Sequence, residues 1–306
     1  MRECRWNAGS VPEGEKVPEL APDRRKTCVI TGATSGLGFE VARQLAAAGM
    51  NLVGIGRSED KCRRAESELR KESPGPDIRF VISDLSALGQ VRAAAETVKA
   101  VLPEGRLDCL VHNAATVSNW YIGTEDGYEL QFAVNYLSAF LLTRELFPCL
   151  SRPREARVIT MCSGSHRRTR INWDDPMLRK RYGCLKAYKQ SKLALVLFTV
   201  ELNRRIAGRF PIRALGIEPG LVDTALGEKN TGGVVRLYWR RRRKKGLPPA
   251  EAAASVVRLA MAPAQDIPQD YWRLWGPTEP SPYARRVDSA LRLWQLSEKL
   301  CGVEFL

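Results

Sequence analysis

The sequence predicts a doubly wound α/β fold, a parallel sheet with helices on both faces. Three observations predict it. Beyond residue 26, short runs with strand composition alternate with helical patterns, as in successive β-α-β units. Several runs are apolar at every position, which is typical of strands that helices cover on both sides. A glycine-rich turn, residues 31–38, joins the first run directly to a helical pattern.

The elements follow one another regularly as far as residue 220. The predicted strands are residues 27–30, 52–55, 78–82, 107–111, 156–161 and 212–217. The predicted helices between them are residues 39–48, 59–71, 88–101, 128–147 and 188–206. An Ala-rich helix (249–261), a Pro-rich loop and an amphipathic closing helix (286–306) are expected to follow. We therefore predict a flexible leader, residues 1–26, and a single domain, residues 27–306, with a C-terminal helical extension.

Composition and charge narrow the functional class without choosing it. The chain of 306 residues carries 48 Lys and Arg against 34 Asp and Glu, and its net charge of +14 favours anionic partners such as phosphorylated cofactors, acidic lipids or nucleic acid. Its 44% hydrophobic content excludes a wholly disordered chain. The eight cysteines are scattered without a C-x-x-C pair, so we expect reduced thiols and no metal site.

We expect no segment of the sequence to span a bilayer. The longest stretch without Lys, Arg, Asp or Glu is residues 109–124, which is too short and too polar. Residues 1–26 carry several charges and no continuous apolar run, so we expect neither a signal peptide nor a membrane anchor there. A cytoplasmic location is the expectation that follows.

The glycine-rich turn has the composition of a phosphate-binding loop. Gly32, Gly36 and Gly38 permit positive φ angles and a close approach of main-chain amides to a pyrophosphate, which then lies at the N-terminus of the next helix. Ser35 and Leu37 belong to the same turn. A packing role for the glycines is the alternative; the strand before the turn and the helix after it favour the phosphate site.

Residues at the ends of the second and third strands bear on the choice of dinucleotide. Arg57 stands where dinucleotide-binding folds usually carry an acid for the ribose hydroxyls. A guanidinium there favours a 2′-phosphate, and therefore NADP over NAD; a solvated arginine at a helix start is the alternative. Asp84, followed by Leu85, either accepts a hydrogen bond from the adenine amino group or caps the next helix.

A tyrosine and a lysine lie one helical turn apart, at Tyr188 and Lys192. A phenol is a poor acid–base group at neutral pH, and a neighbouring ammonium favours the phenolate and lowers the phenol pKa. The same spacing occurs at Tyr182 and Lys186, but Gly183 disfavours a helix there, so we predict that this second pair lies in a loop.

A serine follows the fifth predicted strand, at the edge where doubly wound sheets bind ligands. The hydroxyl of Ser163 is placed to hold a carbonyl group, and Ser165 is a weaker candidate for the same task. Without the tyrosine and the lysine, Ser163 would be an ordinary turn residue.

Together these motifs resemble the short-chain dehydrogenases/reductases over about residues 26–306. They occur in the order of that family: the T-G-x-x-x-G-x-G turn, Asp84-Leu85, Asn113-Ala114, Asn135, Ser163, Tyr188-x-x-x-Lys192 and Pro219-Gly220. The phrase Arg157-Val158-Ile159-Thr160 and the tail Leu293-Trp294-Gln295-Leu296 look most like the branch of retinol dehydrogenases and the X-linked dehydrogenase/reductase.

The resemblance implies a Rossmann-like fold and a role for each matched residue. It implies that Tyr188 is the acid/base, that Lys192 binds the nicotinamide ribose, that Ser163 orients the carbonyl and that Asn135 holds a water in the proton relay. The implied cofactor contacts also include Asn113, Pro219, Gly220, Val222 and Thr224, the last of them near the carboxamide. Residues 225–285 are expected to cover the substrate, and homodimers are common in the family.

The sequence departs from the family pattern in two places. The usual Asn-Asn-Ala-Gly reads His112-Asn113-Ala114-Ala115, which replaces an amide by an imidazole and adds a methyl group beside the cofactor. We expect His112 to be a core histidine that main-chain groups satisfy, with a proton carrier as the alternative. The missing N-terminal anchor puts membrane residence in doubt for a branch often bound to the endoplasmic reticulum.

A basic segment packs seven cations into the ten residues from Arg236 to Lys245, beside Tyr238 and Trp239. Its apolar neighbours suit a lid over the substrate, and cations next to aromatics suit an anionic membrane surface. A solvated cationic helix is the bland alternative. We disfavour nucleic acid as the partner, because no RNA-binding module accompanies the patch.

Two hypotheses of different classes follow. The leading one is an NADP-preferring oxidoreductase that transfers hydride between the nicotinamide and a hydrophobic alcohol or carbonyl, such as a retinoid, a steroid or an isoprenoid. The other is a catalytically weak or inactive member of the family that acts as a dinucleotide-binding scaffold or sensor, because His112 and Ala115 change the segment beside the cofactor.

Overall fold

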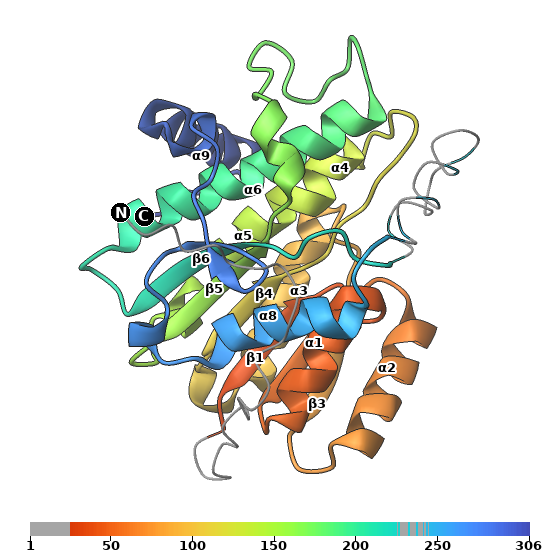
Figure 1. The fold of residues 1–306 in the computed structure, drawn as a ribbon, viewed down its shortest axis with the longest axis vertical. Helices are drawn as coiled ribbons and strands as arrows, with labels where there is room; N and C mark the ends of the chain where they lie inside the picture. The colour runs from red at the N-terminus through yellow and green to blue at the C-terminus, as the bar shows by residue number, and fades with distance from the viewer. Residues whose placement is uncertain are drawn as a thin grey trace, which may run out of the picture.

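The computed structural model describes residues 25–224, 226, 232, 237, 241, 243 and 245–306. Eight strands form one sheet in the order β3-β2-β1-β4-β5-β6-β7-β8, and every neighbouring pair is parallel except β7 and β8 (Figure 1). The strands are β1 (Thr27–Thr31), β2 (Asn51–Gly56), β3 (Ile78–Ile82), β4 (Cys109–His112), β5 (Ala156–Met161), β6 (Ile212–Glu218), β7 (Tyr271–Arg273) and β8 (Gly276–Pro277). The predicted doubly wound parallel sheet is confirmed.

Helices cover both faces of this sheet. The helices are α1 (Gly36–Ala47), α2 (Glu59–Glu72), α3 (Leu88–Val101), α4 (Leu130–Phe132), α5 (Ser138–Leu150), α6 (Cys184–Ile206), α8 (Pro249–Met261) and α9 (Val287–Cys301). One apolar core joins the sheet to α3, α5, α6 and α9, and the other joins it to α1 and α8 (Figure 1). Successive residues of β1 alternate between the two cores, with Val29 in one and Cys28 and Ile30 in the other. Both faces of the strand are therefore buried, which explains its continuous apolar composition.

Most predicted elements lie where the sequence placed them, and two regions differ. The region after α8, predicted as a Pro-rich loop, contains β7 and β8, and β7 extends the sheet beside β6. The predicted helix 128–147 is interrupted by a π-helical turn, η3 (Ala133–Leu137), between α4 and α5. Nearly every residue from 131 to 143 is buried, so this part of the chain has no one-sided apolar pattern in which an extra residue per turn would show.

Parts of the span expected to cover the substrate, residues 225–285, form elements of the fold. Residues 249–261 form α8, which packs on α1, where Gln44 Nε2 donates to Ala250 O (2.8 Å). Residues 271–277 belong to the sheet. These parts are layers of the fold because their side chains are needed to close its core. A covering role for residues 225–285 stays a prediction.

The C-terminal extension packs back onto the domain. Helix α9 ends at Gly302 in the left-handed conformation (φ 61°), which turns the chain so that the Phe305 ring stacks on Trp294 with ring centres 4.9 Å apart. The Trp294 indole donates to Phe305 O (3.1 Å), and Phe140 of α5 contacts both rings. The closing helix is thus part of the core above α5 and α6.

Candidate active site

The predicted site residues lie along one edge of the sheet. Because β1, β2, β4, β5 and β6 run parallel, their carboxyl ends meet at the same edge (Figure 1). The order of the strands reverses direction between β1 and β4, and this switch point is where doubly wound sheets open a crevice for ligands. The glycine turn follows β1, and Ser163 follows β5.

The glycine turn needs glycine for two separate reasons. Gly32 and Gly36 have positive φ angles of 69° and 58°, which side chains rarely adopt. A Cβ on Gly38 would lie 2.2 Å from Asn113 Nδ2 and 2.4 Å from Gly32 O, so the third glycine allows a close approach. Asn113 Nδ2 donates to Thr31 O (2.9 Å) and to Gly32 O (3.2 Å). Asn113 therefore braces the turn through its side chain.

The N-terminus of α1 fits an anionic group such as a pyrophosphate. Ser35 stands at the cap position without a side-chain capping bond, and the first turn of the helix carries no acidic residue. Leu37 is half-buried and packs against the core on this face. A Cβ on Gly36 would come within 3.2 Å of Thr224 Cγ2, so Thr224 lies over the turn. Arg57 follows β2 at the same edge and is exposed.

Asp84 closes a turn ahead of α3. Its Oδ1 accepts a hydrogen bond from Ser86 N (2.9 Å), and Leu85 beside it is buried. The first amide of α3, Leu88 N, donates instead to Asp126 Oδ2 (2.8 Å). The alternative that Asp84 caps the next helix is therefore wrong, because another carboxylate takes that place.

Tyr188 and Lys192 lie one turn apart in the first half of α6, and both are buried. The Ser163 hydroxyl forms a hydrogen bond with the Tyr188 phenol. Lys192 Nζ donates to Met161 O at the end of β5 (2.7 Å) and lies 5.9 Å from the centre of the Tyr188 ring. The sheet edge thus brings together Ser163, Tyr188 and Lys192, as the sequence predicted.

Burial controls the proton affinities of this group. Burial raises the pKa of Tyr188 to about 12, and the hydrogen bond from Ser163 opposes the rise. Burial also lowers the pKa of Lys192 to about 8. The sequence predicted that the Lys192 ammonium would lower the phenol pKa below its ordinary value. In the protein alone, desolvation of the phenol outweighs any such effect.

Asn135 lies in the π-helical turn η3, and its side chain links two segments of the site. Its Oδ1 accepts from Thr116 N (2.7 Å), and its Nδ2 donates to Thr116 O (3.1 Å) and to Ser191 Oγ (2.9 Å). Both amide hydrogens are used, so this side chain ties the loop after β4 to α6. Thr116 and Ser191 were missed by the sequence analysis, because nothing in their local sequence marks them as partners of Asn135.

His112 ends β4 and is buried, as expected for a core histidine. Its partner is a side chain, since His112 Nε2 lies 2.7 Å from Thr143 Oγ1; the prediction of main-chain partners is wrong. Thr143 uses its only hydrogen to donate to Ala139 O (2.7 Å), so His112 Nε2 carries the proton in this pair. Burial lowers the pKa of His112 to about 3, and the ring is neutral at physiological pH. Ala115, the second departure from the family pattern, is half-buried.

After β6 the chain leaves the sheet through Pro219 and Gly220. Further along the chain, residue 247 lies beside residues 222 and 223. Gly220 has a φ of 76°, Val222 pairs with Leu247, and Asp223 N donates to Leu247 O (2.9 Å). Most of the basic segment, Val234 and Val235 before it, and residues 1–24 lie outside the described residues. Within the segment, Arg241 and Lys245 are exposed.

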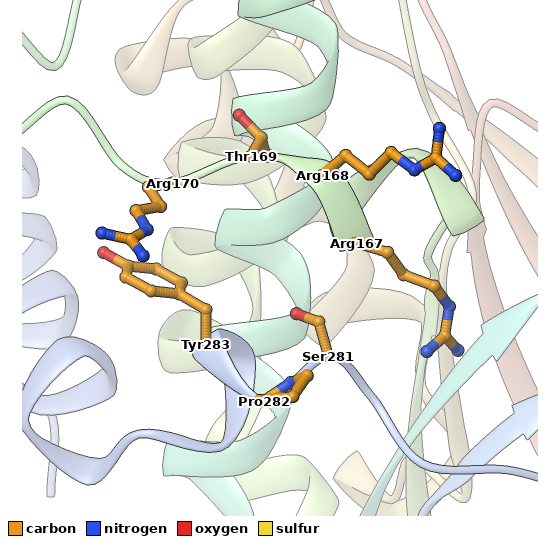
Figure 2. Close-up of a pocket in the computed structure, with 7 residues that line it drawn as sticks. All are labelled: Arg167, Arg168, Thr169, Arg170, Ser281, Pro282 and Tyr283. Atoms are coloured by element: carbon orange, nitrogen blue, oxygen red, sulfur yellow. The ribbon is translucent and has the colours of Figure 1, made fainter.

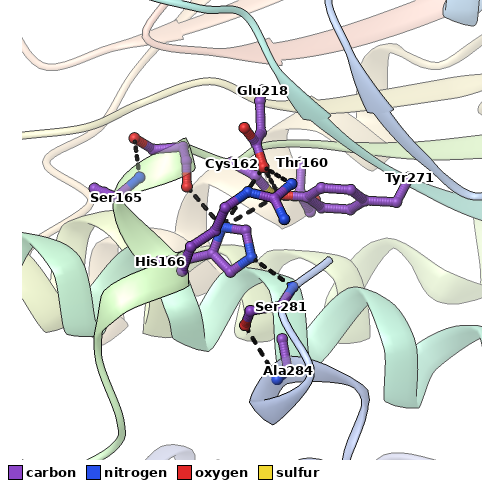
Figure 3. A network of polar contacts seen from close by, with 10 residues as sticks. Thr160, Cys162, Ser165, His166, Glu218, Tyr271, Ser281 and Ala284 are labelled. Atoms are coloured by element: carbon purple, nitrogen blue, oxygen red, sulfur yellow. Dashed lines mark hydrogen bonds and ion pairs between the residues drawn. The ribbon is translucent and has the colours of Figure 1, made fainter. Parts of the chain in front are cut away.

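A buried polar network that the sequence analysis missed joins His166, Glu218 and Tyr271 (Figure 3). Glu218 Oε1 at the end of β6 accepts from Tyr271 (3.0 Å) and from Arg167 (2.8 Å), and His166 is fully buried beside them. The only sequence signals for this network were the positions of two of its members. His166 stands three residues after Ser163, and Glu218 stands directly before Pro219. Next to the network, a pocket of about 410 Å³ is lined by arginines of the η4 turn (Gly164–Arg168) and the residues just after it, and by Ser281, Pro282 and Tyr283 (Figure 2).

The described residues form neither a metal site nor a disulfide. In residues 25–306, apart from those that the structure leaves out, no group of three or more His, Cys, Asp and Glu could hold a metal ion. The seven cysteines of the described part are free thiols. None of the described helices combines the length and the apolar composition needed to cross a bilayer.

Comparisons with known proteins agree with this geometry. The family model of the short chain dehydrogenases matches residues 26–233, more than half of the chain. Retinol dehydrogenase 13 of Mus musculus is 35% identical over 301 residues, which cover 95% of this chain and 88% of that protein. Polyprenol dehydrogenase of Mus musculus is 35% identical over 297 residues, which cover 93% of this chain and 86% of that protein.

A solved structure of an uncharacterised protein from Mycobacterium paratuberculosis has the same fold. Its TM-score is 0.75 at 32% identity, and the match covers 95% of this chain and 97% of that one. The fold, the family model and the curated relatives all agree. The chain belongs to the short-chain dehydrogenase/reductase family of nicotinamide-dependent oxidoreductases, in its retinol dehydrogenase-like branch.

Proposed function

We propose that this protein is an NADP-preferring oxidoreductase that transfers hydride between the nicotinamide and a hydrophobic alcohol or carbonyl of the retinoid, steroid or isoprenoid class. The single observation that carries the proposal is the meeting of Ser163, Tyr188 and Lys192 at the carboxyl edge of the sheet, beside a glycine turn and a helix N-terminus free of acidic residues.

The chemistry of the chain's own residues is proton transfer and orientation. When bound, the nicotinamide supplies or accepts the hydride. In the reducing direction Ser163 and Tyr188 hold the carbonyl oxygen, and Tyr188 gives its proton to that oxygen as the hydride adds to the carbon. Burial keeps the phenol protonated at neutral pH, which is the form that this direction requires. Alcohol oxidation requires the phenolate, which the Lys192 ammonium favours.

The preference for NADP rests on Arg57. The residue is exposed directly after β2, and no acidic residue intervenes between Gly56 and Glu59, the first residue of α2. A guanidinium at this position binds a 2′-phosphate, whereas a carboxylate would bind the ribose hydroxyls. The other proposed cofactor contacts are Gly32, Ser35, Gly36, Leu37, Gly38, Asp84, Leu85, Asn113, Tyr188, Lys192, Pro219, Gly220, Val222 and Thr224.

The hydrophobic substrate class is supported by the relatives and by exposed apolar side chains. The two curated relatives are named for retinol and polyprenol, both lipophilic alcohols. Trp120, Tyr121 and Leu185 expose 56%, 36% and 41% of their surface, and Leu185 stands one turn before Tyr188. Exposed Arg241 and Lys245 of the basic segment suit a peripheral contact with an anionic cytosolic membrane surface from which such a substrate would enter. Liposome flotation tests this contact, and neutralising residues 240–245 is expected to weaken it.

A titration and a substrate panel test the proposed function. Wild-type protein is titrated with NADPH and with NADH and then assayed with retinoid, steroid and isoprenoid alcohols and aldehydes. Arg57→Asp is expected to weaken NADPH binding by about tenfold or more and to spare NADH, because the 2′-phosphate then meets a carboxylate. NADPH binding without turnover of any panel member would support the scaffold hypothesis and contradict the oxidoreductase.

A further inference from the structure

His166, three residues after Ser163, is fully buried, and its ring makes two hydrogen bonds (Figure 3). Its Nδ1 lies 2.8 Å from the main-chain oxygen of Ser163, and its Nε2 accepts a hydrogen bond from Ser281 N (3.0 Å). Ser163 belongs to the strand end that carries the site, and Ser281 belongs to the segment between β8 and α9. The imidazole therefore connects the site to a part of the chain more than a hundred residues away.

These two partners allow only one protonation state. A main-chain N–H can only donate, so Nε2 must present its lone pair to Ser281. A carbonyl oxygen can only accept, so Nδ1 must carry the hydrogen that points at Ser163 O. His166 is thus a neutral imidazole with the hydrogen on Nδ1. Burial favours this state, because it lowers the pKa of His166 below the ordinary value.

The surroundings hold the ring in this orientation. The Tyr271 hydroxyl lies 3.5 Å from His166 Nδ1 and donates to Glu218 Oε1, which also accepts from Arg167. The Tyr271 ring packs edge-on against the imidazole, with ring centres 5.8 Å apart. Glu218 Oε1 lies 3.7 Å from the same nitrogen, His166 Nδ1. The Tyr271 and Glu218 oxygens can both accept a hydrogen bond from Nδ1, so they favour the same position of the hydrogen, and Ser163 O at 2.8 Å is the nearest of the three acceptors.

His166 is placed to act through Ser163 rather than on a ligand. Arg167 and Ser281 belong to the hydrogen-bond network around the imidazole, and both line the pocket shown in Figure 2. His166 itself does not line this pocket. The main chain that His166 holds is that of Ser163, whose hydroxyl meets the Tyr188 phenol. A shift of that main chain would move the hydroxyl away from the phenol.

We propose that His166 is a positioning residue: its Nδ1–H fixes the main chain of Ser163 and thereby holds the serine hydroxyl against Tyr188. This role rests on the proposed function, because it assigns His166 to the same proton-transfer group. It differs from a role in packing alone because it depends on one nitrogen of the ring, the one that faces Ser163.

Two substitutions test the two ring nitrogens of His166 separately. In His166→Asn the amide nitrogen takes the place of Nδ1 and can still donate to Ser163 O, whereas the contact with Ser281 is lost. In His166→Gln the amide reaches the place of Nε2 and can still accept from Ser281 N. The side-chain contact with Ser163 O is lost, and only the main-chain hydrogen bond from N of residue 166 to that oxygen (3.0 Å) remains. We expect Asn to keep kcat within about threefold and Gln to lower it about 10- to 100-fold, with KM for NADPH unchanged in both, since small misplacements of a reacting group cost this much.

Tyr271→Phe is the matched control, because it keeps the ring that packs against the imidazole and removes only a hydroxyl of the same buried network, whose hydrogen bonds go to Glu218 and His166 and not to Ser163. We expect it to lower the Tm and to leave kcat unchanged. A fall in kcat that merely follows Tm across the Asn, Gln and Phe variants would overturn the positioning role.

Nitrogen NMR measures the contact without turnover. The chain has two histidines, and their predicted tautomers are opposite, with the hydrogen on Nδ1 in His166 and on Nε2 in His112. The signal lost in His166→Asn identifies His166. Finding its hydrogen on Nε2, or a charged ring at neutral pH, would contradict the proposal whatever the activity.

The proposed function and the positioning role are contradicted by different results. If the wild type turns over no substrate of the panel, the proposed function fails and the positioning role falls with it. If the wild type is active and His166→Gln retains the kcat of His166→Asn, the positioning role alone is wrong. An active wild type with a selective loss in Gln supports both.

Discussion

Two tyrosine–lysine pairs of identical spacing stand six residues apart in this chain, and only one of them belongs to the proposed site. Tyr182 precedes α6, as the glycine after it predicted, although Lys186 lies in the first turn of that helix. The Tyr182 hydroxyl donates to Ser118 O (2.8 Å) and accepts from Gln131 Nε2 (2.8 Å). Lys186 is exposed. This tyrosine connects loops, and its hydroxyl is fully occupied by the protein.

Tyr188 and Lys192 differ from that pair in what faces them. Both are buried in α6 against the end of β5, where Ser163 contacts the phenol and Met161 O accepts from the lysine. The difference teaches that the Tyr-x-x-x-Lys spacing only places two side chains on the same face of a helix. The chemistry comes from the strand end that this face meets, because the strand end delivers the hydroxyl partner.

Activity gives the largest expected contrast between the two tyrosines. Tyr188→Phe removes the proposed acid and is expected to lower kcat about 10³-fold, within the usual range for general acid–base groups. Tyr182→Phe removes a hydroxyl whose hydrogen bonds go to Ser118 O and Gln131 Nε2, outside the proposed site, and kcat is expected to stay within about threefold. Steady-state kinetics with NADPH and one active substrate of the panel measures both.

The comparison breaks if the two variants lose activity equally. Equal losses would mean that Tyr182 and Tyr188 both act through the fold, and the assignment of the acid to Tyr188 would be wrong. Circular dichroism of both variants verifies that each is folded at the assay temperature.

The sequence could predict the site residues better than their partners. Ser163, Tyr188 and Lys192 are recognisable because strand ends and helix periodicity place them at one edge. Thr143 opposite His112 and Ser281 opposite His166 could not be predicted, because each contact joins segments whose pairing depends on the complete tertiary structure. The raised pKa of Tyr188 was missed for a related reason, since desolvation depends on the packing of every neighbour.

The two lysines give the next contrast, in the pH dependence of stability. Burial lowers the folded-state pKa of Lys192 from 10.5 to about 8, so between these values the unfolded chain binds more protons and wild-type stability rises with pH. Lys192→Met lacks this group. Its free energy of unfolding should exceed that of the wild type most at pH 8 and below, and this advantage should shrink by about 3 kcal/mol towards pH 10.5.

Lys186→Met is the control for this titration, because Lys186 is exposed and its removal relieves no burial. Urea unfolding of the three proteins at several pH values gives the comparison. A difference between wild type and Lys192→Met that stays constant from pH 8 to pH 10.5 would show that the Lys192 ammonium is not desolvated in the folded protein.

The fold was predictable where a pattern is local and long. Residues 78–82 and 156–161 are strands with the predicted ends, and residues 88–101 and 249–261 are helices with the predicted ends. The three residues of β7 could not be identified, because so short a run among prolines has no periodicity and exists only through its pairing with β6. Short elements at a sheet edge depend on neighbours that the local sequence does not contain.

The smallest expected effect is a loss of stability in Tyr182→Phe, the variant that is expected to keep its activity. Tyr182→Phe removes the donor to Ser118 O and the acceptor for Gln131 Nε2, whose other partner, Cys184 O, is 3.3 Å away. Leaving these partly buried groups without a partner is expected to lower the free energy of unfolding by about 1–3 kcal/mol. Urea unfolding measures the loss, with Tyr121→Phe, whose ring packs edge-on against Tyr182, as a control for aromatic packing. A Tyr182→Phe protein as stable as the wild type would mean that water replaces both hydrogen bonds, and that the pair outside the site is a surface feature rather than a connection between loops.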